Sequence, residues 1–160
     1  EILSNFDFEG RQYRPPDNEV NALISFGNMM CYSECLRSIN QTQLNPTISY
    51  LHSLGDRRYS LALDIAEIFK PILVDRLIFK VVNKNEIQKK DFDQHINRIV
   101  LKDSGRKKFV QSWENKLSET IQHRTLKRSV SYKHLIKLEC YKIMKEILDI
   151  EEYKPLKMWW

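Results

Sequence analysis

Four polar residues interrupt apolar stretches within residues 34–67, and their types suit metal-ion chemistry. Glu34 falls on an apolar helical stripe, His52 follows a short β-prone stretch, and Asp64 and Glu67 lie inside the apolar run 61–69. Ionised side chains that leave water need a partner, because desolvating a charge costs several kcal/mol or more. A divalent ion is one such partner. Carboxylates together with an imidazole suit Mn²⁺ or Mg²⁺, and the histidine favours manganese.

A metal site of this kind predicts phosphoryl transfer. Its open coordination positions would take water and substrate oxygens, while Arg57, Arg58 and Lys70 would hold a phosphodiester against the ion. The metal would polarise the phosphate and stabilise the leaving oxygen, so that no protein nucleophile is required. Each residue also has a structural explanation. A loop histidine is commonly a hydrogen-bonded structural residue, and acids early in a helix are favoured by its dipole.

The elements that must position these residues are predicted to be helices. Gly and Pro number only 4 and 5, and β-type alternation is rare. The pattern predicts an all-α, compact, multi-helix domain spanning residues 1–160, in which the acids converge if the first two helices pack side by side. The first expected helix runs from an N-cap at Asp17 to about residue 40, and the second runs from a cap at Ser60 to about 82 and bends or restarts at Pro71. A short helical turn is expected near 91–98. The last two helices are expected from 104 or 105 to about 123 and from 131 to 148.

The composition is that of one soluble globular domain. The chain has 160 residues, with 42% hydrophobic and 29% charged residues, and contains no apolar run of the roughly 18 residues that a membrane span needs. Because the first residue is Glu1, we expect a fragment of a longer chain. Three cysteines argue against a disulfide scaffold, and the absence of CxxC argues against zinc. Cys31 and Cys35 are expected to be small core residues, and a reducing, cytoplasmic setting fits best.

Positive charge is concentrated in residues 103–137. This segment holds nine Lys and Arg residues against three acids, in a chain whose net charge is +5. Such a segment indicates a polyanionic partner such as DNA, although a solvated helical face would have the same composition. Arg106, Lys107 and Arg128 are the candidate DNA contacts here.

Several separated motifs occur in order along the chain. They are Arg14-Pro15-Pro16, residues 21–27, Tyr32-Ser33-Glu34, Leu51-His52, residues 60–71 with Asp75-Arg76, Tyr153-Lys154-Pro155 and Trp159-Trp160. With these motifs the chain resembles, over essentially its whole length, the universal CRISPR-associated endonuclease and integrase of spacer acquisition. The match corresponds to the C-terminal helical catalytic domain, without the family's N-terminal β-rich domain.

The resemblance implies a role for each site residue. Glu34, His52 and Glu67 fall on the family's metal ligands, and Asp64 falls on an additional acid that supports catalysis. Arg14, in the first motif, joins the candidate DNA contacts. Lys70 stands where the family often has Arg, which keeps the charge but weakens bidentate phosphate contact.

The resemblance also implies the reaction and the partners. The family uses Mn²⁺ or Mg²⁺ to insert short foreign DNA fragments as spacers into a CRISPR array, by transesterification from their 3′-hydroxyl ends, as part of antiviral defence. It also cleaves branched DNA. It works with a small ferredoxin-like CRISPR-associated partner, and its full-length members form homodimers. Two alternatives remain open: a non-catalytic helical nucleic-acid-binding module, and a folded but inert building block of the larger enzyme.

Overall fold

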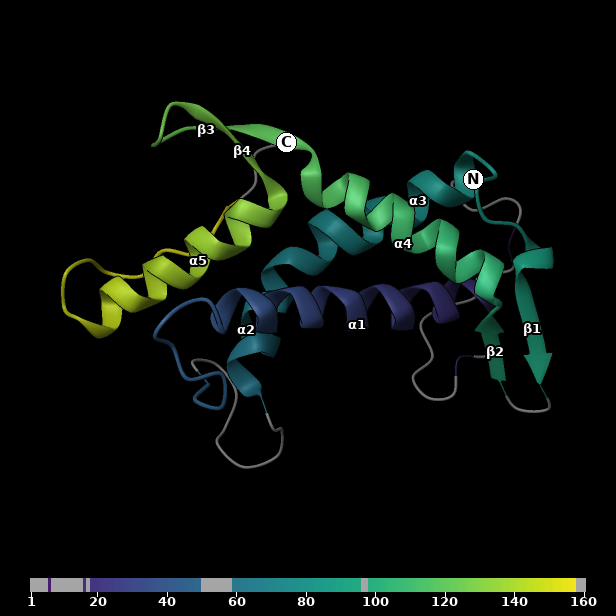
Figure 1. Cartoon of the computed structure of the whole chain (residues 1–160), viewed down its shortest axis with the longest axis horizontal. Helices are drawn as coiled ribbons and strands as arrows, with labels where there is room; N and C mark the ends of the chain where they lie inside the picture. The colour runs from purple at the N-terminus through teal and green to yellow at the C-terminus, as the bar shows by residue number, and fades with distance from the viewer. Residues whose placement is uncertain (1–5, 7–15, 17, 50–58, 96–97, 158–160) are drawn as a thin grey trace.

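One long helix, α1 (Glu19–Ile39), runs through the middle of the molecule, and the other elements pack around it (Figure 1). The computed structural model describes residues 6, 16, 18–49, 59–95 and 98–157. Asn18 caps α1, because its side-chain oxygen accepts a hydrogen bond from the Asn21 backbone N–H at 2.8 Å. The predicted extent of the helix is confirmed to within two residues at each end. The predicted cap was wrong, since the capping side chain is that of Asn18 and not Asp17.

The second helical stretch changes its winding at a proline. Helix α2 (Ser60–Phe69) continues as the π-helical segment η1 (Lys70–Asp75) and then as α3 (Arg76–Asn83). Pro71 lies at the start of η1, and its missing N–H interrupts the regular ladder of hydrogen bonds. The sequence predicted a bend or a restart at Pro71, and the structure has a change from α-helical to π-helical winding there. Ser60 does not cap the helix; it is the first helical residue, and its hydroxyl donates to the Thr47 carbonyl at 2.9 Å.

Two short antiparallel hairpins replace parts of the predicted helices. Strand β1 (Phe92–His95), which follows the 3₁₀ turn η2 (Lys89–Asp91), pairs with β2 (Arg98–Leu101), and β3 (Thr120–His123) pairs with β4 (Arg128–Ser131). The predicted helical turn near 91–98 was therefore wrong. The predicted helix ending near 123 was too long, because α4 (Asp103–Ser118) stops before β3. The fold is otherwise helical, as expected.

The last helix, α5 (Tyr132–Ile147), begins where the sequence predicts. The Ser131 hydroxyl oxygen accepts a hydrogen bond from the His134 backbone N–H at 3.2 Å and so caps the helix. Figure 1 shows α5 beside the C-terminal end of α1, whereas β1 and β2 lie at the opposite end of that helix. The two ends of α1 therefore face different neighbours.

The core forms where α1 crosses η1 and α4. A Cβ atom added at Gly27 would lie 2.6 Å from Val74 Cγ1 and 3.3 Å from the ring of Phe109, so only glycine permits this close approach. The Phe26 and Phe109 rings also meet edge to face, with centroids 5.5 Å apart. Trp113 and Leu117 continue the buried stripe of α4. This crossing fixes the position of α1, and hence of the polar residues further along it.

The three cysteines belong to the same core. Cys31, Cys35 and Cys140 are free thiols, and each is fully buried. Burial raises the pKa of the Cys140 thiol to about 12, which keeps it protonated and unreactive at neutral pH.

Among the helices that the structure describes, none combines the length and the apolar character needed to cross a membrane.

Candidate metal and nucleic-acid site

Glu34 occupies the buried side of α1, as its place in the apolar stripe predicted. Only 9% of the residue is exposed, and Cys35 and Ser38 beside it are buried as well. Burial raises the pKa of the Glu34 carboxyl, and this effect outweighs the opposing charges of Lys133 and Arg37. The Arg37 guanidinium lies 3.9 Å from the carboxylate and is itself largely exposed. Glu34 is therefore a poorly solvated acid with positive charge nearby.

The two acids of α2 lie in different surroundings. Asp64 is 3% exposed, whereas the Glu67 side chain is 56% exposed and forms an ion pair with Lys70 one turn later. Residues three apart lie on adjacent parts of a helix surface, so one can face the core while the other reaches its edge. This difference in exposure fits the predicted roles, with Asp64 as the buried supporting acid and Glu67 as the more accessible metal ligand.

Helices α1 and α2 pack side by side, as convergence of the acids requires. The Cys31 thiol donates to the Ala66 carbonyl at 3.9 Å. Cys31 lies one turn before Glu34, and Ala66 lies between Asp64 and Glu67. The contact therefore brings the two acid-bearing stretches to one helix interface.

The ligand set itself stays a prediction. His52 lies outside the described residues, and within the described part of the chain no three His, Cys, Asp or Glu side chains gather closely enough to hold an ion. The donor chemistry nevertheless fits a divalent cation, since two carboxylates and one imidazole are ligands that Mn²⁺ accepts. The described carboxylates need a further donor, and the segment 50–58 would have to supply it.

The predicted DNA contacts divide into three groups. Arg14, Arg57 and Arg58 lie outside the described residues. Lys70 is bound to Glu67, and the Arg106 guanidinium lies 3.3 Å from Asp103. Lys107 on α4 and Arg128 on β4 are exposed, which leaves them accessible to a ligand.

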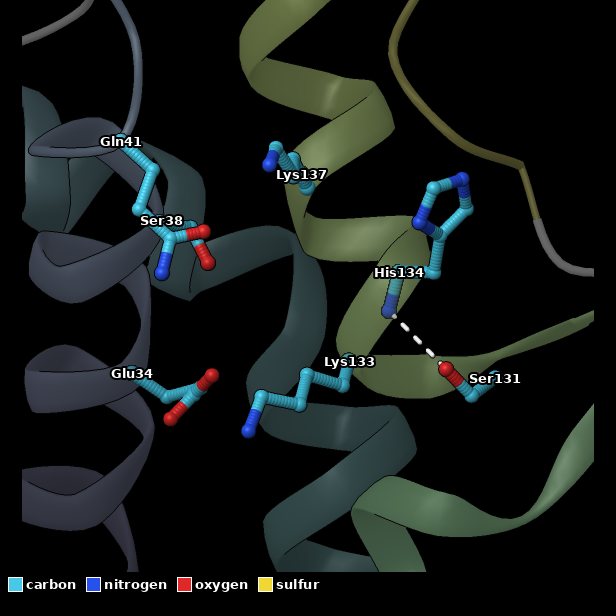
Figure 2. A pocket seen from close by; sticks show the side chains of 7 residues that line it. All are labelled: Glu34, Ser38, Gln41, Ser131, Lys133, His134 and Lys137. Atoms are coloured by element: carbon cyan, nitrogen blue, oxygen red, sulfur yellow. Dashed lines mark hydrogen bonds between the residues drawn. The ribbon is translucent and has the colours of Figure 1, made fainter.

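Sequence reasoning missed a cavity that adjoins Glu34. A hollow of about 240 Å³ separates the C-terminal half of α1 from the first turns of α5 (Figure 2). In Figure 2 the Lys133 side chain extends across this space towards the Glu34 carboxylate. The signal available in the sequence was the spacing of Lys133 and Lys137, which places both on one face of a helix. The residues that line the cavity are Glu34, Ser38, Gln41, Ser131, Lys133, His134 and Lys137.

A family model, curated relatives and a solved structure that resemble this chain all concern one protein family. The family model for "CRISPR associated protein Cas1" matches residues 1–115. A CRISPR-associated endonuclease Cas1 of Clostridium perfringens is 55% identical over 159 residues, which cover 99% of this chain and 48% of that protein. The chain thus spans about half the length of the curated relatives it matches.

Solved structures share the fold. A Cas1 protein from Thermotoga maritima superposes with a TM-score of 0.86 at 44% identity, over 95% of this chain and 49% of that one. A casposase bound to an integration product superposes with a TM-score of 0.84 at 23% identity, over 96% of this chain and 47% of the casposase, which is a likeness of fold. The arrangement of α1, α2 and α5 around Glu34 is therefore one that known proteins share.

Proposed function

Because this chain belongs to the Cas1 family of CRISPR-associated proteins, we propose that it carries the metal-dependent site of a DNA endonuclease and integrase. The reaction is the insertion of short foreign DNA fragments as spacers into a CRISPR array. The observation that carries the proposal is the setting of Glu34. It is a buried acid on a helix packed against the acid-bearing α2, beside a cavity with basic walls.

Glu34, His52 and Glu67 are the proposed ligands of one Mn²⁺ or Mg²⁺ ion, and Asp64 is the acid that supports them. When bound, the ion polarises the phosphate and stabilises the leaving oxygen. Lys70 holds the Glu67 carboxylate beside the site. In the joining step, the 3′-oxygen of the incoming fragment forms a bond to phosphorus and the bond from phosphorus to the leaving 3′-oxygen of the target breaks. The same exchange in reverse cleaves branched DNA.

The partners follow from the family resemblance. The whole protein is proposed to act as a homodimer on double-stranded and branched DNA, together with a small ferredoxin-like CRISPR-associated protein, in the cytoplasm. The free thiols of the three cysteines are compatible with that reducing setting. Lys107 and Arg128, exposed on α4 and β4, are proposed to contact the DNA outside the metal site.

Substitution of the two ligand carboxylates tests the proposal. Glu34→Gln and Glu67→Gln in the whole protein remove a charge while keeping the side-chain volume. We expect each to reduce Mn²⁺-dependent joining of a labelled duplex to a target carrying a repeat by about 100-fold or more, since a catalytic metal supplies several kcal/mol of transition-state stabilisation. Glu151→Gln is the matched control for Glu67→Gln, because Glu151 is also exposed and also pairs with a lysine, Lys145. A fully active Glu67→Gln variant would show that the proposed ligand set is wrong.

The leading alternative is a non-catalytic nucleic-acid-binding module. It is favoured by the basic groups beside the acids, since Glu67 forms an ion pair with Lys70 and the Arg37 guanidinium lies 3.9 Å from the Glu34 carboxylate. Calorimetric titration of Mn²⁺ into the wild type and into His52→Ala distinguishes the two functions. The integrase proposal requires binding to the wild type that weakens markedly in the variant. Absence of binding to both proteins would favour the module.

A further inference from the structure

The cavity beside Glu34 is large enough for a charged group and its water. Its volume of about 240 Å³ is well above the roughly 10–15 Å³ that a single water molecule needs. Its walls come from two helices that are far apart in the sequence, α1 and α5. Glu34 and Ser38 form the buried wall, whereas Lys133, His134 and Lys137 rise from the first two turns of α5. Most of these groups are polar, which suits a hydrated ligand better than an apolar one.

The balance of charge in the cavity favours an anion. The walls hold two lysines and the single carboxylate of Glu34, so they carry a net positive charge even when His134 is neutral. Lys133 and Lys137 are four residues apart on α5, so their charges repel each other. One lysine would be enough to neutralise the Glu34 carboxylate. The second positive charge is therefore unexplained by the acid alone.

The two lysines differ from their neighbours in forming no close ion pair with an acid of the described residues, although the charge of Lys133 acts on the Glu34 carboxyl. Lys116 lies 2.6 Å from Glu119, and Lys142 lies 2.9 Å from the buried Glu139. Neither Lys133 nor Lys137 forms an ion pair with any acid in the described part of the chain, and the Lys137 amine instead lies 5.9 Å from the centre of the Tyr141 ring. A ligand that enters the cavity would meet the Lys137 ammonium group and would share the charge of Lys133 with Glu34.

We propose that this cavity is a subsite for one DNA backbone phosphate, which Lys133 and Lys137 bind beside Glu34. An ammonium group on a flexible stem binds phosphate oxygens as a point charge, and two such groups can contact one phosphate from adjacent helical turns. The subsite would hold the strand at the carboxylate that the reaction needs. The identity of the ligand as DNA rests on the proposed function.

Binding of DNA in the absence of divalent metal tests the subsite. Fluorescence anisotropy of a labelled branched duplex is measured with the whole protein in EDTA, between about 50 and 200 mM NaCl. We expect Lys133→Gln and Lys137→Gln each to weaken binding about five- to tenfold. The Lys133→Gln/Lys137→Gln double variant loses the phosphate contact altogether and should also reduce the slope of log K against log salt by about 0.9. Lys133→Arg keeps the charge and should bind within about twofold of the wild type.

The matched control is Lys84→Gln, which removes the same charge from an exposed residue outside the cavity. Equal affinities and equal salt slopes in Lys84→Gln and the Lys133→Gln/Lys137→Gln double variant would overturn the subsite. Lys133 is exposed, so Lys133→Gln alone decides the question if Lys137→Gln lowers the melting temperature. A wild type that binds DNA through these lysines but never joins strands would refute the proposed reaction and leave the subsite standing. A wild type that does not bind DNA would overturn both.

Discussion

Gly27→Ala is expected to destabilise the protein, although alanine is the better helix former. The added methyl group would lie 2.6 Å from Val74 Cγ1, and the β-branched valine has little rotamer freedom with which to move away. Overpacking of a core costs about 1–3 kcal/mol, and the gain in helix propensity returns about 0.5–1 kcal/mol. We therefore expect a net loss of up to about 2.5 kcal/mol, which corresponds to a melting temperature lower by up to about 10 °C in a chain of this size.

A double-mutant cycle separates this steric explanation from a general effect of substitution. Val74→Ala alone should cost about 2 kcal/mol, because Val74 is fully buried. In the double variant the methyl group added at Gly27 enters the space left by the valine, so the combined loss should be smaller than the sum by about 1–3 kcal/mol. Urea unfolding followed by far-ultraviolet circular dichroism measures each free energy. Ser25→Ala, at an exposed site of the same helix, is the control and should be neutral or slightly stabilising. Additive losses at Gly27 and Val74, within about 0.5 kcal/mol, would refute the reasoning.

Two further predictions concern buried carboxylates outside the metal site. Burial raises the pKa of Asp91, but hydrogen bonds from Lys108 and from the Gln88 backbone outweigh it, so the net pKa is lowered. Asp91 therefore stabilises the fold above its unfolded pKa, and this contribution is lost as the pH falls through the lower folded pKa. Asp91→Asn should cost about 2 kcal/mol in urea unfolding at neutral pH, and its deficit should shrink as the solution is acidified; a deficit independent of pH would contradict the assignment. Tyr153→Phe removes the hydroxyl that donates to the buried Glu139 at 2.7 Å, a contact that ties residues 153–156 to α5. It should cost about 1–2 kcal/mol in urea unfolding and accelerate proteolysis near residue 153, and unchanged proteolysis would show that the hydroxyl does not hold this segment.

The long helices could be predicted from the sequence because their signals are repeated over many residues. The stripe of α1 and the cap of α5 at Ser131 each agree with the local pattern. The hairpins could not, since each strand has only four residues and buries few of them, Phe92 and Leu101 in the first pair and Val130 in the second. Alternation over four residues is too short to distinguish from a helical turn.

The candidate site was predictable in its residue types but not in its surroundings. A charge on an apolar stripe identified Glu34 as buried, and the structure confirms this burial. The different exposures of Asp64 and Glu67 depend on how α2 is rotated against α1, which spacing alone does not determine. The cavity required knowledge that α5 lies beside α1, a contact between segments about 100 residues apart in sequence.

The π-helical segment η1 rotates the side chains of α3 about the helix axis relative to those of α2. A turn closed by i→i+5 hydrogen bonds holds one residue more than an α-helical turn, and one residue corresponds to about 100° of rotation. The segment Lys70–Asp75 therefore sets the angle between the face of α2 that carries Asp64 and Glu67 and the face of α3 that buries Leu77 and Val81. Removing one residue from this segment would rotate these two faces relative to each other by about 100° without altering any of the acids. The length of η1 therefore helps to determine how Asp64 and Glu67 are oriented relative to the buried face of α3.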